Sequence, residues 1–496
     1  MISPHRLIPP RVGLSIVLAI LVLPYAVCCA SQHADPRRPP NIVLILVDDL
    51  GWMDLSCQGS KYYETPNIDR LARQSMRFTD GYAACAVCSP TRAAWLTGRY
   101  PARIGVTDWI RASFQLGGRQ RTEADRPPAY QTRSKRKLLC PNNPYWMEHS
   151  EVTLAEELKR AGFVTCHIGK WHLGYKDWYP PAQGFDINIG GCDFGQPPSY
   201  FDPYQGTRGK PWNNNTFRIP TLQPRKKGEY LTDREADEAS RFIHENKDRP
   251  FFLNLCHYAV HTPLQARKNL IHKYQAKPKH GQINATYAAM IESVDDSVGR
   301  VMAALEDAGV ADHTLVIFSS DNGGLSRSTR NAPLREGKGT PYEGGIRVPW
   351  IIRWPGHVPP GTLSHEPIIS CDVLPTVLEA THMQPGDDRP IDGVSLVQHL
   401  ESGGRTRLHR PLFWHFPHYR GRWTPYAVIR DGDYKLIHWF EDGKNELYNL
   451  KDDLGEQHDL AEQMPEKAAA MNEALSAWLV GVGAKVPKPN PDVAAR

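Results

Sequence analysis

Predominantly apolar residues form four runs of strand length in the first two thirds of the chain. The runs are Asn41–Val47, Phe163–Ile168, Phe251–Cys256 and Thr314–Phe318. Apolar character that continues over such a length is typical of strands covered on both faces, as in parallel sheets. We therefore expect these segments to be strands of one buried sheet.

Helical patterns fill the intervals between these runs. Thr65-Pro66 has the residue types of an N-cap and a first helical position. Four apolar residues then fall on one helical face: Ile68, Leu71, Ala72 and Met76. Two capping boxes predict further helix starts: Thr153…Glu156 and Thr232…Glu235. A long helix is predicted over Tyr287–Leu305, so strands and helices alternate along the chain.

The pattern changes near Phe413, where short alternating strands are followed by a helix. The predicted elements are Tyr426–Arg430, Tyr434–Phe440 and Glu466–Leu479. The expected fold class is therefore α/β, with a large, mostly parallel sheet flanked by helices over residues 41–405 and a smaller C-terminal α+β domain over 406–496. Polar stretches at 111–145 and 177–227 are predicted to be insertions that form walls of a cleft.

The N-terminus has the pattern of a cleavable signal peptide. Arg6 and Arg11 precede the apolar run Val12–Val27, and Cys28-Cys29-Ala30 supplies small residues before Ser31. We expect a signal peptide over residues 1–30, a linker over 31–40, and export to the periplasm or the medium without a stable membrane span. The alternative is an uncleaved anchor, because the run is nearly long enough to span a bilayer.

Composition and charge exclude several classes of protein. Hydrophobic residues make up 41% and charged residues 23% of the 496 residues, which excludes wholesale disorder. The formal charge of +5 falls to +3 when Arg6 and Arg11 are removed with residues 1–30. With no clustered basic stripe, no nucleic-acid partner is expected.

The cysteines do not form a disulfide framework. Ten cysteines less Cys28 and Cys29 leave eight, which are scattered along the chain. The spacing of Cys85 and Cys88 matches half of a zinc site, but no second pair completes it. We therefore interpret Cys85 as a small core residue.

Polar side chains follow each of the four predicted strands. They are Asp48 and Asp49, the segment Gly169-Lys170-Trp171-His172, His257 and His261, and the pair Asp321-Asn322. Three carboxylates at one sheet edge would repel one another by about 4 kcal/mol per close pair at an effective dielectric of 20. A bound calcium or magnesium ion would remove that repulsion. The alternative is that these residues only cap or form turns.

The most specific motif is Cys88-Ser89-Pro90-Thr91-Arg92. Ser89 as N-cap and Pro90 at the first position predict a short helix that ends near Gly98. With Leu96-Thr97-Gly98-Arg99, this motif resembles the signature of type I sulfatases, in the alkaline-phosphatase-like superfamily. The resemblance extends over most of residues 41–375 and includes further segments: Asn41–Gly51, Gly169–Gly174, His261-Thr262-Pro263, Ser320–Gly324, Gly337-Lys338-Gly339 and Glu343-Gly344-Gly345. Near the C-terminus, Glu446-Leu447-Tyr448-Asn449-Leu450 also resembles these enzymes.

The resemblance implies a cofactor and a set of roles. In the family, the residue at the position of Cys88 is oxidised by a maturing enzyme to Cα-formylglycine, which joins Asp48, Asp49, Asp321 and Asn322 in binding Ca²⁺. One hydroxyl of the hydrated aldehyde attacks sulfur, and the other expels sulfate from the covalent intermediate. The remaining implied roles are positioning of formylglycine by Arg92 and Lys170, sulfate contact and protonation of the leaving oxygen by Lys338 and His261, and proton uptake by His172.

The resulting hypothesis is an exported sulfatase that acts on sulfate esters, with a sulfated small molecule or carbohydrate as substrate. Two alternatives are a phosphonate or phosphate ester hydrolase of the same superfamily and a catalytically inactive protein that binds sulfated glycans. We interpret His167 and His257 as structural residues, because a histidine near a strand end is more often a satisfied structural group.

Overall fold

The computed structural model describes residues 1–10, 38–116, 121–207 and 216–494. The predicted signal peptide (1–30) and linker (31–40) lie mostly outside these ranges. Residues 1–10 are exposed and lack regular secondary structure. Residues 39–496 form one compact unit, which contains both predicted domains. None of the helices in the described ranges is long and apolar enough to cross a membrane.

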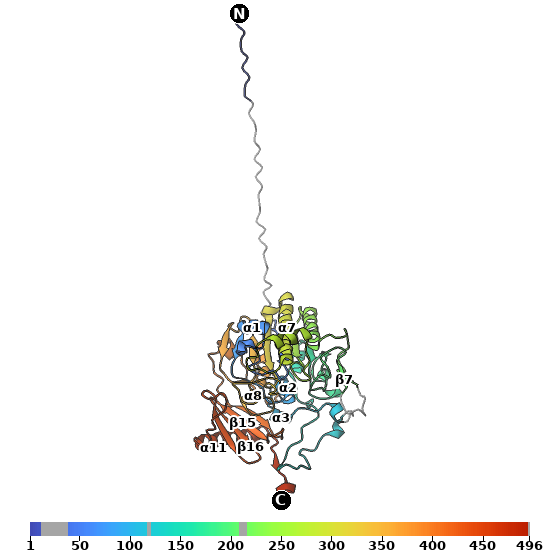
Figure 1. Ribbon diagram of the computed structural model, residues 1–496, viewed down its shortest axis with the longest axis vertical. Coiled ribbons are helices and arrows are strands. Elements are labelled where there is room, and N and C mark those ends of the chain that lie inside the picture. Colours follow the sequence, from blue (N-terminus) through green and yellow to red (C-terminus); the bar gives the residue numbers. More distant parts are fainter. Residues whose placement is uncertain (11–37, 117–120, 208–215, 495–496) are drawn as a thin grey trace. The chain divides into compact units, whose positions relative to one another are not determined.

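The large sheet has eight strands and is mostly parallel. Figure 1 shows the folded unit that contains it. Its strands, in spatial order, are β12 (Thr362–Ser364), β2 (Met76–Phe78), β11 (Trp350–Arg353), β10 (Thr314–Ser320), β1 (Asn41–Val47), β9 (Phe251–Cys256), β5 (Val164–Gly169) and β6 (Ile187–Ile189). Strand β11 runs antiparallel to both of its neighbours, and the other pairs are parallel. The four apolar runs therefore become the four adjacent central strands, which confirms the predicted α/β class.

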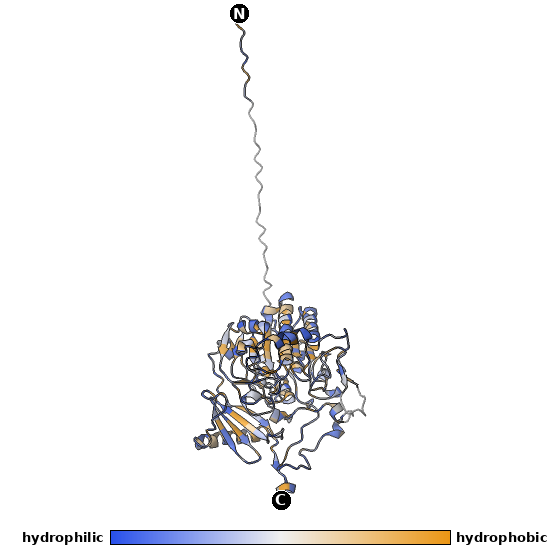
Figure 2. Ribbon diagram, viewed as in Figure 1, coloured by the Kyte–Doolittle hydropathy of each residue, from blue (hydrophilic) through white to orange (hydrophobic). Residues whose placement is uncertain are grey.

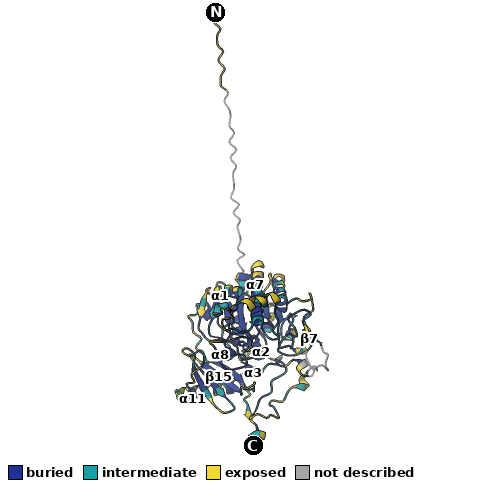
Figure 3. Ribbon diagram, viewed as in Figure 1, coloured by how far each residue is buried: buried dark blue, intermediate teal, exposed yellow. Residues whose placement is uncertain are grey.

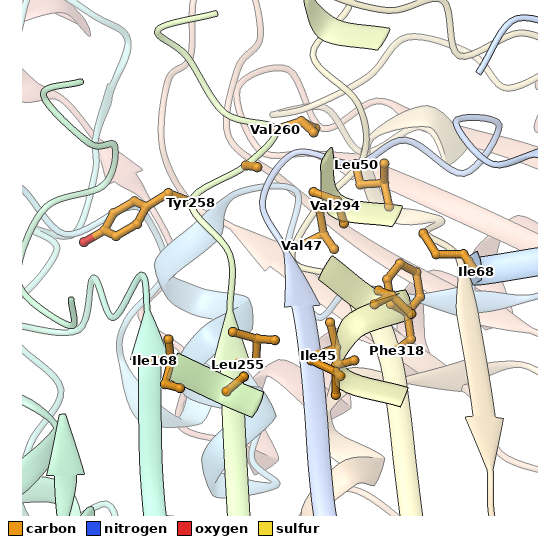
Figure 4. Packing of buried hydrophobic residues seen from close by; sticks show 14 of the residues in the cluster. Ile45, Val47, Leu50, Ile68, Ile168, Leu255, Tyr258, Val260, Val294 and Phe318 are labelled. Carbon is orange, nitrogen blue, oxygen red and sulfur yellow. The ribbon is translucent and has the colours of Figure 1, made fainter. Parts of the chain in front are cut away.

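Helices cover both faces of this sheet. One face packs against α1 (Pro66–Arg73), α5 (Leu231–Asn246), α6 (Lys268–Ala276) and α7 (Ala285–Asp307). The other packs against α2 (Cys88–Thr97), α4 (Leu154–Arg160), α9 (Val373–Ala380) and α10 (Val397–Glu401). Figure 4 shows Ile168, Leu255, Ile45 and Phe318, from four adjacent strands, lined up beneath Val294 of α7. Burial on both faces explains why these strands have few polar residues.

A second sheet of four antiparallel strands lies near the C-terminus. Its strands are β14 (Leu412–Phe416), β15 (Tyr426–Asp431), β16 (Tyr434–Trp439) and β17 (Asn445–Asn449), and α11 (Pro465–Gly481) packs against them. Figure 2 shows hydrophobic residues along these strands, and Figure 3 shows β15 as buried. The smaller α+β unit predicted from the sequence is thus present.

Short elements complete the fold. They are β3 (Gly81–Tyr82) paired with β13 (Ile368–Ile369), β4 (Leu138–Leu139) paired with β18 (Lys488–Pro489), β7 (Gln205–Thr207) paired with β8 (Thr216–Arg218), and the helices α3 (Pro101–Ile104), α8 (Glu343–Ile346) and α12 (Pro491–Ala494).

Three local predictions were wrong. Met76 is not on a helix, because α1 ends at Arg73 and Met76 begins β2. The capping box at Thr232 is absent, because the N-cap of α5 is Tyr230, two residues earlier. The carboxylate of Glu235 accepts a hydrogen bond from His257 Nδ1 at 2.6 Å instead. The third, at Ser89, concerns the functional site. The capping box at Thr153 is confirmed.

Candidate active site

The polar residues after the central strands meet at one edge of the large sheet. Asp48 and Asp49 follow β1, Asp321 and Asn322 follow β10, and Lys170 follows β5. Because these strands are parallel, their carboxyl ends lie at the same edge, where open α/β sheets bind ligands. All ten predicted site residues belong to a single buried or nearly buried cluster.

The acidic residues are held against one another. Asp49 N donates to Asp321 Oδ1 at 3.2 Å, and Asn322 Nδ2 donates to Asp49 Oδ1 at 2.8 Å. One potential ligand atom from each of Asp48, Asp49, Cys88 and His261 lies within 4.8 Å of the others. These contacts bring together four of the five residues predicted to bind metal, and Asp321 joins them through the backbone of Asp49.

Each carboxylate has one cationic partner. Lys170 Nζ donates to Asp48 Oδ2 at 2.6 Å, and Lys338 Nζ donates to Asp49 Oδ1. Arg92 Nε donates to Asp321 Oδ2 at 2.9 Å, and its Nη1 donates to the carbonyl oxygen of Lys170 at 2.8 Å. Arg92 therefore positions Asp321 and the loop after β5.

Three oxygens of the cluster remain without a hydrogen-bond partner among the described residues. They are Asp48 Oδ1, Asp49 Oδ2 and Asn322 Oδ1, all buried. Burial, followed by the charge of Asp321, raises the pKa of Asp48. Burial also acts to raise the pKa of Asp49, but Lys338 and other nearby cations hold it below its ordinary value. Unpartnered carboxylate and amide oxygens are the donor set that Ca²⁺ prefers, so these residues fit that ion.

Cys88 is the first residue of α2 and lies directly beside this cluster. Its Sγ lies 3.5 Å from Lys338 Nζ, and burial raises the pKa of the thiol. The predicted N-cap is wrong: Val87 is the N-cap, and Ser89 lies inside the helix. The hydroxyl of Ser89 instead donates to the carbonyl oxygen of His172 at 2.8 Å, so it ties α2 to the loop after β5.

In each of the two histidines one ring nitrogen makes no hydrogen bond to the described residues. His261 Nδ1 donates to the carbonyl oxygen of Thr262 at 2.8 Å, which leaves Nε2 3.7 Å from Asp49 Oδ2. His172 Nε2 donates to the carbonyl oxygen of Ile110 at 2.7 Å, and its buried Nδ1 has no hydrogen-bond partner within the described ranges. In each ring the nitrogen that faces a carbonyl oxygen carries a proton, so in the neutral form the other nitrogen is an acceptor. Burial and Lys338 lower the pKa of His261 to about 3.

Backbone geometry makes room for the ring of His172. This residue has a left-handed backbone, with φ of 62°. A Cβ on Gly195 would lie only 2.6 Å from His172 Cε1. A glycine at this position in the second insertion is therefore required by the ring that it faces.

A pocket of about 320 Å³ opens in front of these groups, and we call it the catalytic pocket. Cys88, His172, His261 and Lys338 line it. Sequence reasoning missed its other polar and aromatic lining residues: Trp109, Gln115, Gln196, Arg327 and Arg420. Gln115 and Gln196 lie in the two insertions, whose polar, aromatic composition was the only signal for them. Trp109, Arg327 and Arg420 lie outside the insertions, and no sequence pattern pointed to them. Gln115 and Gln196 confirm that both insertions contribute to the wall.

The residues interpreted as structural are satisfied inside the fold. His257 bonds to Glu235 at 2.6 Å and to Ser297 at 3.0 Å. His167 bonds to Asn254 at 3.1 Å. Cys85 is buried in an apolar cluster, and all eight described cysteines are free thiols.

Comparison with known families assigns the class of protein. The sulfatase family model matches residues 40–383, and a model described as N-sulphoglucosamine sulphohydrolase, C-terminal, matches residues 337–481. The chain belongs to the sulfatase family, within the alkaline phosphatase superfamily, and is a sulfuric ester hydrolase.

Several relatives and solved structures resemble the whole catalytic unit. A sulfatase of Formosa agariphila is 34% identical, over 96% of this chain and 97% of the relative. Human N-acetylgalactosamine-6-sulfatase is 35% identical, over 81% of this chain and 72% of the relative. The crystal structure of Ps i-CgsB has a TM-score of 0.73 at 29% identity, covering 89% of this chain and 93% of that one, and a second structure of it contains k-i-k-neocarrahexaose.

Proposed function

We propose that this protein is an exported sulfatase that hydrolyses sulfate esters on a sulfated carbohydrate, using Ca²⁺ and a formylglycine made from Cys88. The observation that carries the proposal is the set of three buried, unpartnered oxygens beside Cys88, with a polar pocket in front of them. The carbohydrate class is supported by relatives named for N-acetylgalactosamine 6-sulfate chemistry and by the neocarrahexaose complex. Export is supported by the residue pattern of positions 1–30.

Asp48, Asp49, Asp321 and Asn322 would hold the calcium ion together with the modified residue 88. When bound, the ion would supply Lewis-acid activation of an oxygen nucleophile and would offset the crowded negative charge. Lys170 and Arg92 keep two of these carboxylates in place through the bonds described above.

The formylglycine would replace a soft thiol by oxygen. Its hydrate would supply two hydroxyls on one carbon, the first to accept the sulfuryl group and the second to release it. The buried thiol of Cys88 is an unsuitable calcium ligand, because calcium prefers oxygen. A maturing enzyme that oxidises Cys88 is therefore an expected partner.

Lys338 and His261 would act on the substrate. Burial acts to lower the pKa of Lys338, but Asp49 and the other acidic groups around it together raise it. The ammonium therefore stays charged beside Cys88, where it would contact the sulfate oxygens. His261 Nε2 would donate a proton to the leaving oxygen as the sulfur–oxygen bond breaks. Because burial and Lys338 lower its pKa, this role requires that the negative charge of the bound sulfate raise that pKa again.

His172 would act in the second half of the reaction. Its Nε2–H donates to the carbonyl oxygen of Ile110, so Nδ1, which has no hydrogen-bond partner among the described residues, would accept a proton when sulfate is expelled. Its place in the catalytic pocket, on the loop after β5, suits that role.

The central experiment combines mass spectrometry with paired assays. Protein made in a host that matures other sulfatases is expected to contain formylglycine at position 88 and to hydrolyse aryl sulfates and defined sulfated saccharides. Unmodified cysteine in such a host would contradict the formylglycine assignment. Faster hydrolysis of the matching aryl phosphate or phosphonate would instead favour the alternative hydrolase.

The two histidines are separated by their dependence on the leaving group. His261→Ala is expected to slow substrates with poor leaving groups by about 10²–10⁴-fold, and activated aryl sulfates far less. His172→Ala is expected to slow all substrates to a common rate and to accumulate a sulfated enzyme. Rates across aryl sulfates of graded phenol pKa, with mass spectrometry of the quenched enzyme, test both roles. Accumulation of the sulfated enzyme in His261→Ala rather than in His172→Ala would contradict the roles assigned to the two histidines.

A further inference from the structure

A second pocket lies next to the catalytic pocket and shares one wall with it. This side pocket has a volume of about 330 Å³, and Trp109 lines both pockets. Its other lining residues include Asp108, Arg111, Arg136, Asn143 and Tyr419. A ligand that extends out of the catalytic pocket past Trp109 would therefore enter a cavity with polar, charged and aromatic walls.

The backbone on each side of Trp109 makes hydrogen bonds to a residue that lines one of the two pockets. On the side-pocket side, Asn143 Oδ1 accepts from Asp108 N at 3.0 Å, and Asn143 Nδ2 donates to the Asp108 carbonyl oxygen at 2.9 Å. On the catalytic side, the carbonyl oxygen of Ile110 accepts from His172 Nε2 at 2.7 Å. Hydrogen bonds thus restrain the loop on both sides of Trp109. This restraint lowers the entropic cost of stacking a ligand on the indole.

Arg111 brings a positive charge to this wall. Its guanidinium lies 5.5 Å from the centre of the Trp109 ring, and the side chain is exposed. No carboxylate within the described ranges forms an ion pair with it. The neighbouring Arg121 and Arg126 of the same insertion, in contrast, pair with acidic residues. The charge of Arg111 is therefore available to an anionic ligand.

Asp108 provides an acceptor that the protein leaves unused. Its Oδ1 is buried and has no hydrogen-bond partner among the described residues. Burial raises the pKa of this carboxyl, while a backbone hydrogen bond and the charges of Arg420 and Arg111 act in the opposite direction. A buried acceptor without a donor is unfavourable, and a ligand hydroxyl would satisfy it.

We propose that the side pocket is a sugar-binding subsite for the residue adjacent to the sulfated sugar, and that it selects an anionic substituent on that residue. The apolar face of the sugar would pack on Trp109, one hydroxyl would donate to Asp108, and a sulfate or carboxylate group would bind Arg111. The inference rests on the proposed carbohydrate function and narrows the substrate to an oligosaccharide or polysaccharide with more than one anionic group.

The kinetic test compares four sulfate esters. One is a sulfated monosaccharide, and three are disaccharides that carry the same sulfated sugar beside a neutral, a sulfated or a uronic acid residue. The wild-type enzyme is expected to prefer the disaccharides with an anionic neighbour. Arg111→Ala is expected to reduce this preference in kcat/KM by about tenfold or more, mainly through KM, because charged hydrogen bonds are the strong ones.

Control variants separate the subsite from general effects of charge. Arg73→Ala, at an exposed position on α1 outside both pockets, is expected to keep the wild-type preference. Arg111→Lys should retain part of it, because the charge remains while bidentate contact is lost. The relative rates with the sulfated and the uronic neighbour show which anion the pocket selects. Equal kcat/KM for monosaccharide and disaccharides in the wild type would overturn the proposal.

A binding measurement distinguishes failure of the subsite from failure of the proposed function. Protein produced without the maturing enzyme retains the thiol of Cys88, and calorimetry with the disaccharides then reports binding alone. Tighter binding of the anionic disaccharide that is lost in Arg111→Ala supports the subsite even if no sulfate ester is hydrolysed. Binding that does not change in Arg111→Ala contradicts the subsite, even in an active sulfatase.

Discussion

Two clusters of buried charged residues in this molecule have similar composition, but they differ in how many of their polar atoms have a hydrogen-bond partner among the described residues. The catalytic cluster contains Asp48, Asp49 and Asp321 with three cationic partners, and some of its buried oxygens have no hydrogen-bond partner in the part of the chain that the structure describes. The second cluster joins the C-terminal sheet to helix α8 and centres on Lys435 and Glu343.

The second cluster, unlike the first, is fully paired. Lys435 Nζ donates to Glu343 Oε1 at 2.8 Å and to Glu456 Oε1 at 2.7 Å, and Glu456 Oε2 accepts from Glu343 N at 2.7 Å. Glu343 Oε2 also accepts from Arg347 at 2.6 Å and from Tyr82 at 2.8 Å. Buried charged groups that pair with one another hold the C-terminal sheet against α8. Buried oxygens without a hydrogen-bond partner instead indicate a site for a ligand.

The largest effect on stability is expected from breaking the paired cluster. Lys435→Met removes the cation shared by two buried carboxylates and should lower the free energy of unfolding by about 3–5 kcal/mol. Denaturant unfolding measures the change, with exposed Lys451→Met as a control that should stay within about 0.5 kcal/mol of the wild type. A decrease in the free energy of unfolding no larger than that of Lys451→Met would show that the cluster does not hold the C-terminal sheet against α8.

The catalytic cluster should respond to calcium instead. Ca²⁺ at 100 times its Kd is expected to stabilise the wild type by about 2.7 kcal/mol, because it binds only the folded state. Asp49→Asn should lose this calcium-dependent shift in melting temperature together with activity, since it removes one charged ligand. An equal shift in Asp49→Asn would place the ion elsewhere.

A smaller effect is expected where the two regions meet. Tyr448 OH accepts from Arg335 Nη1 at 3.0 Å and donates to Glu446 Oε2 at 2.8 Å. Arg335 lies three residues before Lys338 in the segment between β10 and α8. Tyr448→Phe should therefore lower the free energy of unfolding by about 1 kcal/mol and reduce kcat on an aryl sulfate. A loss of stability with unchanged kcat would show that this contact does not position Lys338.

Much of the large sheet could be predicted because its strands have a simple burial pattern. Asn41–Val47 and Phe251–Cys256 have the predicted bounds, and the helix predicted over Tyr287–Leu305 extends by two residues at each end. Predictions failed where a side chain had a competing tertiary partner. Ser89 and Glu235 have the residue types of helix caps, but Ser89 bonds to the loop after β5 and Glu235 bonds to His257.

The sequence by itself determined the chemistry of the catalytic centre: carboxylates, lysines and histidines directly follow apolar strands, and parallel strands end at one edge. Only the tertiary structure decided which atoms have no hydrogen-bond partner among the described residues, namely Nδ1 of His172 and one oxygen each of Asp48, Asp49 and Asn322, because distant segments supply the partners of the other atoms. The same holds for Trp109. Its place between two pockets depends on hydrogen bonds that its neighbours make to distant residues: Ile110 bonds to a residue 62 positions away and Asp108 to one 35 positions away, separations that no local pattern encodes.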